Sequence, residues 1–360
     1  MDDLYALSEA ELAARLTALG EPAYRARQVR TWLYEKGASS FHEMTDLPKR
    51  LRERLEEHFA LGALVVETEQ QSRDGTVKRL YKLHDGQLVE AVLMAYDDGR
   101  RTACISSQAG CAMGCVFCAT GQMGFARHLT STEIFEQAAL YARELQQKGE
   151  RLSNVVLMGM GEPFHNYDAV LEAIRRLNRE LGIGARHITV STVGLAPKIR
   201  QFAEEGLQVT LAISLHAATD AERSALLPVN DRWPIAELLD ACRHYVDKTG
   251  RRITFEWALI AGKNDQPEVA ERLGRLLRGL PCHVNLIPLN PTTRYDGAPT
   301  ALPDAARFVE ILERHGVPAT VRVRRGIDID AGCGQLKSTV MKRRAPPVSS
   351  PEPGEPTPSR

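Results

Sequence analysis

The sequence has 360 residues, a hydrophobic content of 43% and a formal net charge of zero at pH 7. Such a length suits one large domain with a small one, or two medium domains. The chain has no run of about 18 apolar residues, which argues against a membrane span. The acidic, amphipathic N-terminus lacks the basic start and apolar stretch of a signal peptide, so we expect a cytoplasmic protein with no membrane partner.

Seven cysteines in a cytoplasmic chain indicate metal or redox chemistry rather than a disulfide framework. The zero net charge neither favours nor excludes nucleic acid as a partner, because a local basic patch is sufficient for binding.

Residues 1–60 have the pattern of amphipathic helices. Ser8 and Glu11 form a capping box at the first helix, and further helical stretches begin near Pro22 and Pro48. This region is locally basic, through Arg25, Arg27, Arg30, Lys49, Arg50, Arg52 and Arg54. A basic helix face is either simply solvated or a contact for RNA. We therefore expect a helical accessory domain, for which RNA binding and solvation are equal alternatives.

Residues 61–103 predict a β-hairpin extension that joins this domain to the rest of the chain. Short apolar runs at 64–66, 79–81 and 88–92 have the character of strands. Asp85-Gly86 has the composition of a two-residue turn between the second and third runs.

From residue 104 to about 343, strand patterns alternate with helical ones. The predicted strands are 154–158, 187–191, 209–215, 253–260, 283–288 and 319–323. Strands that alternate with helices form a parallel sheet with crossover helices, so the fold class is α/β, with a partial or full (β/α) barrel. Residues 344–360 are rich in proline without apolar periodicity, and we expect a disordered tail there.

The strongest chemical signal is the spacing C-x3-C-x2-C formed by Cys111, Cys115 and Cys118. Three thiolates in one glycine-containing loop suit three corners of an iron–sulfur cube and leave the fourth iron open. A zinc site is the alternative, but zinc prefers four ligands and the next candidate, His128, lies ten residues further on. The spacing resembles that of the radical SAM superfamily, which implies a [4Fe-4S] cluster whose open iron binds S-adenosylmethionine (SAM).

Polar groups also follow several predicted strands. Gly161 and Glu162 follow the strand at 154–158, and they resemble the superfamily motif that holds the amino group of SAM. The other positions are Ser191, the run Ser214-Leu215-His216, and Asn290. Ligand-binding groups of parallel barrels gather at the C-terminal strand ends, so one shared pocket is expected. Each residue taken alone is more commonly a cap of the following helix.

The whole chain to about residue 343 resembles the RlmN/Cfr family of RNA methyltransferases. The matching pieces are Cys104-Ile-Ser-Ser-Gln with the cluster motif, Met158-Gly-Met-Gly-Glu-Pro163, Leu211-Ala-Ile-Ser-Leu-His216, Asn285-Leu-Ile-Pro and Cys333-Gly-Gln-Leu336. The form Met-Gly-Met-Gly-Glu-Pro is more similar to the RlmN branch than to the Cfr branch.

The resemblance implies methylation of adenine carbon 2 in 23S rRNA and in tRNA. One SAM methylates Cys333, and a second SAM yields a radical that activates the S-methyl group for addition to adenine. Glu90 is implied as the proton acceptor. Cys104 is implied to release the RNA by forming a transient disulfide with Cys333. The basic residues Arg322, Arg324, Arg325, Lys337, Lys342, Arg343 and Arg344 would contact RNA phosphates.

Three other functions stay open at this point. A Cfr-like enzyme would methylate carbon 8 of the same adenine. Another radical SAM reaction would not need Cys104 and Cys333. A non-enzymatic RNA-binding protein would hold a fully ligated structural cluster. Flavodoxin or ferredoxin is the expected electron donor, and we expect a monomer.

Overall fold

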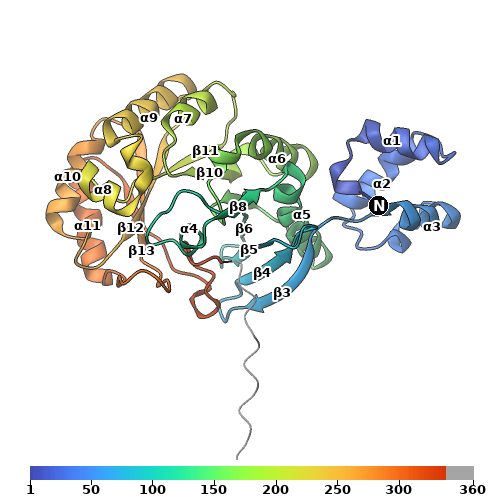
Figure 1. The fold of residues 1–360 in the computed structure, drawn as a ribbon, viewed down its shortest axis with the longest axis horizontal. Coiled ribbons are helices and arrows are strands. Elements are labelled where there is room, and N and C mark those ends of the chain that lie inside the picture. Colours follow the sequence, from blue (N-terminus) through green and yellow to red (C-terminus); the bar gives the residue numbers. More distant parts are fainter. Residues whose placement is uncertain (338–360) are drawn as a thin grey trace, which may run out of the picture.

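The computed structural model describes residues 1–337, in which a small helical lobe lies beside a larger α/β body (Figure 1). The lobe contains α1 (Glu9–Ala18), α2 (Arg25–Tyr34) and α3 (Lys49–His58), with the short parallel pair β1 (Asp2–Asp3) and β2 (Phe59–Ala60). The predicted capping box is present, because Ser8 and Glu11 each accept a hydrogen bond from the other's backbone N–H. Leu12 and Leu16 are fully buried, so the lobe has its own apolar centre.

The larger body is built on a ten-stranded sheet in the order β14-β13-β12-β11-β10-β9-β6-β5-β4-β3. Its parallel part contains β6 (Arg101–Cys104), β9 (Asn154–Leu157), β10 (Ile188–Thr192), β11 (Thr210–Ser214), β12 (Ile253–Leu259), β13 (Cys282–Pro288) and β14 (Ala319–Val321). This confirms the predicted α/β partial barrel. All seven residues of β12 are buried, as expected for a strand covered on both faces.

Helices connect the parallel strands and cover the outside of the barrel (Figure 1). They are α5 (Ser131–Gln147), α6 (Tyr167–Glu180), α7 (Ala196–Ala203), α8 (Asp220–Leu226), α9 (Ile235–Thr249), α10 (Pro267–Leu277) and α11 (Leu302–Arg314). The second predicted capping box, Thr130 with Glu133, begins α5. Cys242 on α9 and Cys282 on β13 are buried core residues, as predicted.

An antiparallel extension continues the sheet beyond β6. It consists of β3 (Val65–Gln71), β4 (Val77–Lys82) and β5 (Leu88–Ala95). The predicted turn at Asp85-Gly86 joins β4 to β5, but its loop has three residues, 84–86, rather than two, because Leu83 N donates to the Gln87 carbonyl oxygen and Gly86 N to that of Leu83. Gly86 has a positive φ of 83°. A separate antiparallel pair, β7 (Gln108–Gly110) with β8 (Phe125–His128), frames the cysteine loop and the short helix α4 (Ala119–Met123).

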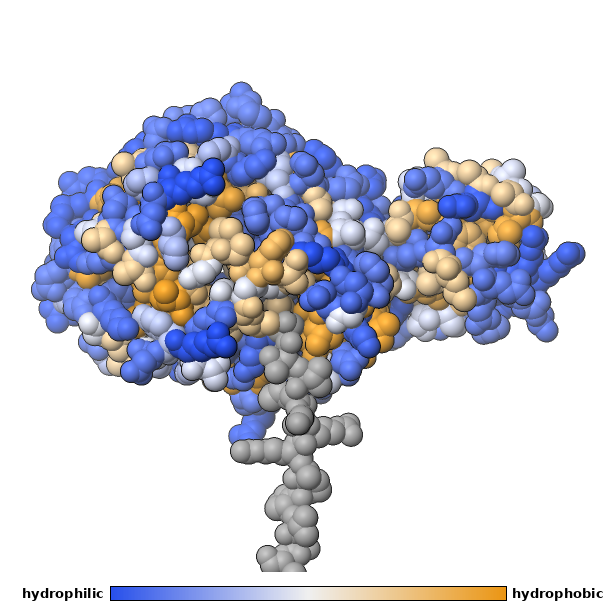
Figure 2. Space-filling model, in the orientation of Figure 1, coloured by the Kyte–Doolittle hydropathy of each residue, from blue (hydrophilic) through white to orange (hydrophobic). Residues whose placement is uncertain are grey.

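The face in Figure 2 has hydrophilic edges, and apolar residues reach its surface near the middle of the larger body. In Figure 1 the same region carries α4 and lies in front of the barrel strands. None of the helices in residues 1–337 is both long enough and apolar enough to span a membrane. The predicted tail at 344–360 and the basic residues Lys342, Arg343 and Arg344 lie outside the described residues.

Candidate active site

A cavity of about 990 Å³, part of it open to solvent, lies at the C-terminal ends of the barrel strands. The structure brings most of the predicted cofactor residues to its wall: Cys111, Cys115, Cys118, Gly161, Glu162, Ser191, Ser214, His216 and Asn290. The parallel register of the strands explains this meeting, because each strand delivers its end to the same edge of the barrel.

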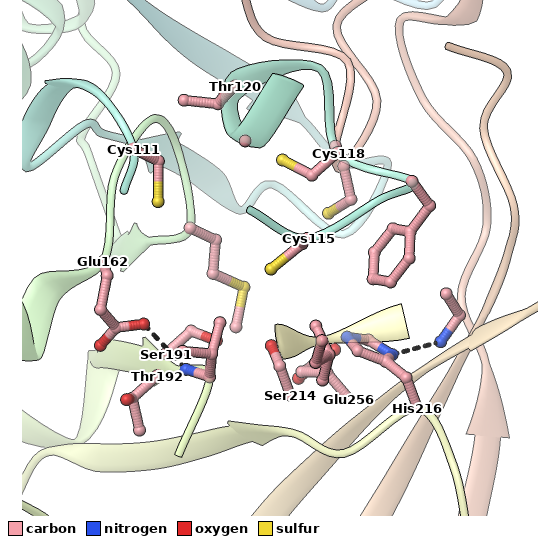
Figure 3. Close-up of a pocket in the computed structure, with 18 of the residues that line it drawn as sticks. Cys111, Cys115, Cys118, Thr120, Glu162, Ser191, Thr192, Ser214, His216 and Glu256 are labelled. Atoms are coloured by element: carbon pink, nitrogen blue, oxygen red, sulfur yellow. Dashed lines mark hydrogen bonds between the residues drawn. The ribbon is translucent and has the colours of Figure 1, made fainter. Parts of the chain in front are cut away.

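The three thiols of the cysteine loop surround one part of this cavity (Figure 3). Burial raises the pKa of the Cys111 thiol to about 12 and that of Cys115 well above its ordinary value. Metal coordination would offset that cost, because a metal-bound thiol gives up its proton. Within residues 1–337, no three His, Cys, Asp or Glu side chains are arranged to hold a single metal ion. The donor set, three thiols around a space, fits three corners of an iron–sulfur cube.

Glu162 lies opposite the thiols, on the loop after β9 (Figure 3). Its Oε1 accepts from Phe164 N at 2.9 Å and its Oε2 from Val193 N at 2.8 Å, which fixes the carboxylate at the cavity wall. Burial raises the pKa of this carboxyl to about 7. A bound ammonium group would favour the ionised form, so the site fits the amino group of SAM.

The glycine before Glu162 is required by close packing. Gly161 has a φ of 100°, and a Cβ at this position would lie 2.6 Å from the Cβ of Gln108. Gln108 also accepts a hydrogen bond from Glu162 N at 2.8 Å. The short strand β7 therefore supports the loop that carries Glu162.

His216 presents a hydrogen-bond donor to the cavity. Its Nδ1 accepts from Ala258 N at 2.8 Å (Figure 3), so the proton of the neutral ring lies on Nε2. Burial lowers the pKa of His216 to about 3, which keeps the ring neutral. Phe117, from the cysteine loop, packs edge-on against this ring with centroids 4.9 Å apart.

A second cavity, of about 630 Å³, adjoins the first. Cys104 lines the second cavity, and Cys333 lines both cavities. Asn290 holds the Cys333 loop, because its Nδ2 donates to the Cys333 carbonyl oxygen at 3.1 Å. The two isolated cysteines, 229 positions apart in the printed sequence, thus share one space beside the three-thiol loop.

The disulfide implied between Cys104 and Cys333 is absent from the structure, in which both residues are free thiols. Burial raises the pKa of Cys104 to about 12, and the surrounding cavity wall raises that of Cys333 above its ordinary value although Cys333 itself stays exposed. Arg322, which lines the same cavity, opposes both shifts.

Glu90 lies on β5 and lines neither cavity. Its Oε1 is 3.4 Å from Lys78 Nζ, and its Oε2 accepts from Lys337 N at 2.8 Å. The carboxylate therefore contacts the loop that follows Cys333, and its role as proton acceptor stays a prediction. Leu215 is fully buried and lines neither cavity; its backbone N–H donates to the Glu256 carbonyl oxygen.

Several wall residues were not assigned to the site by sequence reasoning, among them Met158, Glu256 and Arg322. Met158 lines both cavities, Glu256 lines the first, and Arg322 lines the second. The sequence could have indicated Glu256 as a site residue, because it is the one charged residue in the apolar strand run 253–259. Arg322 was predicted to contact phosphates, whereas its side chain is only 28% exposed and lines the same cavity as Cys104 and Cys333.

Comparison with known proteins agrees with this geometry. Residues 105–273 match the model of the radical SAM superfamily, and residues 2–61 match the ribosomal RNA large subunit methyltransferase N-terminal domain. The dual-specificity RNA methyltransferase RlmN 1 of Myxococcus xanthus is 53% identical over 97% of this chain and 98% of its own length. A probable RlmN of Halalkalibacterium halodurans is 47% identical over 95% of both chains.

The chain belongs to the RlmN family. The expected resemblance is thereby confirmed, and the RlmN branch was the correct one. The crystal structure of a radical SAM methyltransferase from Sphaerobacter thermophilus is 51% identical, with a TM-score of 0.89 over 94% of this chain and all of that one. The RlmN fold therefore extends from the helical lobe through the barrel.

Proposed function

We propose that this protein methylates carbon 2 of adenine in 23S rRNA and in tRNA. Its full-length relatives are named dual-specificity RNA methyltransferases. The observation that carries the proposal is the placement of Cys104 and Cys333 in one cavity that adjoins the three-thiol cavity. The rival radical SAM reactions, glycyl-radical activation and isomerisation, do not need a second reactive pair of thiols.

A [4Fe-4S] cluster with SAM, when bound, would supply both the methyl group and the radical chemistry that activates it. Cys111, Cys115 and Cys118 would hold the cluster. Glu162 would accept from the SAM ammonium, since both of its oxygens are already fixed at the wall. Ser191, Ser214 and His216 offer donors to the rest of the ligand.

The chain's own groups would then carry the methyl transfer. The Cys333 sulfur carries the methyl group, whose carbon becomes bonded to adenine carbon 2 after losing a hydrogen. Glu90 takes the proton from carbon 2. Cys104 then attacks the Cys333 sulfur, so that a disulfide forms as the sulfur–carbon bond breaks and its electron pair stays with the base. A proton completes the methyl group, and the unpaired electron that the radical addition leaves on the base would be taken up by the bound cluster. Arg322 supports this step because its charge favours the thiolate form of Cys104.

RNA would reach the cavity from the side where Arg324 and Arg325 line its mouth. Their charges would hold phosphates, and the target adenine would leave its stack to enter the cavity. The helical lobe would add a second contact, since it matches the family's N-terminal domain. Flavodoxin or ferredoxin would deliver the electron, and we expect the protein to act as a monomer.

Two substitutions test the division of labour between the cysteines. Cys333→Ala has no sulfur to methylate, so it should give neither product nor adduct. Cys104→Ala can form the bond to adenine but cannot break it, so it should accumulate a protein–RNA crosslink. A denaturing gel with and without RNase would detect the crosslink.

Cys242→Ala is the matched control, because Cys242, like Cys104, is a buried thiol but lines neither cavity. It should retain activity without trapping RNA. If Cys104→Ala contains its cluster yet shows no RNase-sensitive shift, the covalent mechanism is wrong for this protein.

A further inference from the structure

Glu256 is a buried carboxylate with one oxygen that lacks a partner. The residue lies in the middle of β12, is 4% exposed, and lines the first cavity beside Ser214 (Figure 3). Its Oε1 accepts from Asn285 Nδ2 at 3.0 Å. Its Oε2 has no hydrogen-bond partner among the described residues. A buried acceptor without a donor is unfavourable, so this oxygen is suited to a donor supplied by a ligand.

Arg322 lies next to this oxygen but does not satisfy it. Arg322 Nη1 is 3.8 Å from Glu256 Oε2, which is beyond hydrogen-bond length. Within the described residues, the one hydrogen bond of its guanidinium is a long contact to Met158 Sδ, 3.9 Å away. A guanidinium has five N–H donors, so Arg322 retains donors for a ligand.

Both groups lie near the sulfur that is proposed to carry the methyl group. Cys333, Met158 and Asn290 line both cavities, so the space around Glu256 is continuous with the space around Arg322. The negative charge of a Cys333 thiolate is the main influence that raises the pKa of Arg322, and Glu256 contributes less. Along the cavity wall, an acceptor, a donor and the reactive sulfur are therefore neighbours.

We propose that Glu256 and Arg322 recognise the Watson–Crick edge of the target adenine. Glu256 Oε2 would accept from the N6 amino group, and Arg322 would donate to N1. Carbon 2 is the next atom along that edge, so the same contacts would place it against Cys333. The inference rests on the proposed function, and it names the residues that select the base.

The acceptor of Glu256 and the donors of Arg322 would together distinguish adenine from guanine. Adenine presents a donor at N6 and an acceptor at N1, which complement a carboxylate and a guanidinium. Guanine presents a carbonyl oxygen at position 6 and an N–H at N1, so each group would meet its own kind. A buried group left facing the wrong partner is a strong basis for selectivity.

The test uses reconstituted holoenzyme and two RNA fragments that differ at the target nucleotide. One carries adenosine, and the other carries purine riboside, which lacks the N6 amino group but retains N1 and carbon 2. The wild-type protein should prefer adenosine by tenfold or more, both in dissociation constant and in rate of methylation. In Glu256→Gln, Asn285 should keep the amide oxygen, the amide nitrogen would face N6, and the preference should fall below about twofold.

Glu136→Gln is the matched control, because Glu136 is a buried carboxylate that lines neither cavity. It should keep the full preference. The dissociation constant of SAM, measured without RNA, should be unchanged in Glu256→Gln. If Glu256→Gln does not fold, Arg322→Gln with an RNA that carries 1-deazaadenosine, which lacks N1, tests the other half of the pair.

A Glu256→Gln protein that retains the wild-type preference would overturn the inference. So would a loss of SAM affinity with unchanged base preference, which would assign Glu256 to the cofactor. In either case wild-type methylation of the adenosine RNA would leave the proposed function intact. Failure of the wild-type protein to methylate any adenine would instead remove the proposed function, and this inference with it.

Discussion

Individual side chains in the cavity combine a structural and a chemical task. Glu162 caps the turn after β9 through Phe164 N and also receives Val193 N from the turn after β10. It is 2% exposed and faces the thiols across the cavity. Its charge is thus placed at the point where two strand ends meet, and a cationic group of a ligand would be held there.

Replacing Glu162 with Gln should separate cofactor binding from cluster assembly. Gln keeps the size of the side chain but removes the charge, so the dissociation constant of SAM should rise tenfold or more, since hydrogen bonds to charged groups contribute about 1.5–3 kcal/mol. Iron content should stay unchanged, because Cys111, Cys115 and Cys118 remain. Equilibrium dialysis with labelled SAM measures the first quantity. Equal SAM affinity in Glu162→Gln and in the exposed control Glu57→Gln would refute the role.

At this scale the sequence predicted residues that stand at strand ends and missed residues inside strands. Ser191, His216 and Asn290 could be predicted from the sequence because each is a polar residue that follows an apolar run. Glu256 was missed because a strand pattern alone does not say which face lines a cavity. Glu90 was assigned by resemblance, and its contacts with Lys78 and Lys337 could not be inferred from the sequence because they join distant segments.

Among the secondary-structure elements, the connection between lobe and barrel has a specific anchor. Glu136 on α5 is fully buried and accepts from Ala63 N at 3.0 Å and from Leu64 N at 3.1 Å. Gly62 must precede these residues, because a Cβ there would collide with the Glu136 carboxylate, and its φ is 106°. The segment 62–64, which joins the helical lobe to the extension strands, is thereby fixed to α5 of the barrel.

The stability of this connection should depend on pH. Burial raises the pKa of Glu136 from 4.5 to about 7. The folded state therefore favours the protonated form, and the penalty for ionisation is absent below 4.5 and complete above 7. Each pKa unit corresponds to about 1.4 kcal/mol. Glu136→Gln should consequently gain thermal stability relative to wild type on going from pH 5 to pH 8.

Differential scanning calorimetry across this range measures the effect, with Glu57→Gln as the exposed control. A difference between Glu136→Gln and wild type that stays constant from pH 5 to pH 8 would contradict the explanation.

The long barrel strands were predicted within one or two residues, because each is an apolar run bounded by helical patterns. The short strands β6, β7 and β8 were not predicted. β6 has the sequence Arg-Thr-Ala-Cys and β8 has Phe-Ala-Arg-His, and neither has a strand pattern of its own. Their pairing partners, β5 and β9 for β6 and β7 for β8, come from other parts of the fold. These segments are therefore strands because they pair with strands elsewhere in the fold, and not because of their local β-propensity.

For the molecule as a whole, the barrel brings segments from most of the sequence to one opening. The cysteine loop lies near residue 115, Glu162 and His216 come from middle strands, and Cys333 arrives on the segment after the last strand. The helical lobe lies to one side and leaves this face accessible (Figure 1). Such an arrangement suits a large RNA that contacts the lobe and inserts a single nucleotide into the cavity.

The most direct test of the central claim is the identity of the methylated nucleoside. The reconstituted protein would be incubated anaerobically with SAM, a reductant and either 23S rRNA or tRNA, and the RNA would then be digested for mass spectrometry against synthetic standards. We predict 2-methyladenosine from both RNAs with wild type and none with Cys333→Ala. Formation of 8-methyladenosine, or of no methyladenosine by a protein with a complete cluster, would contradict the account.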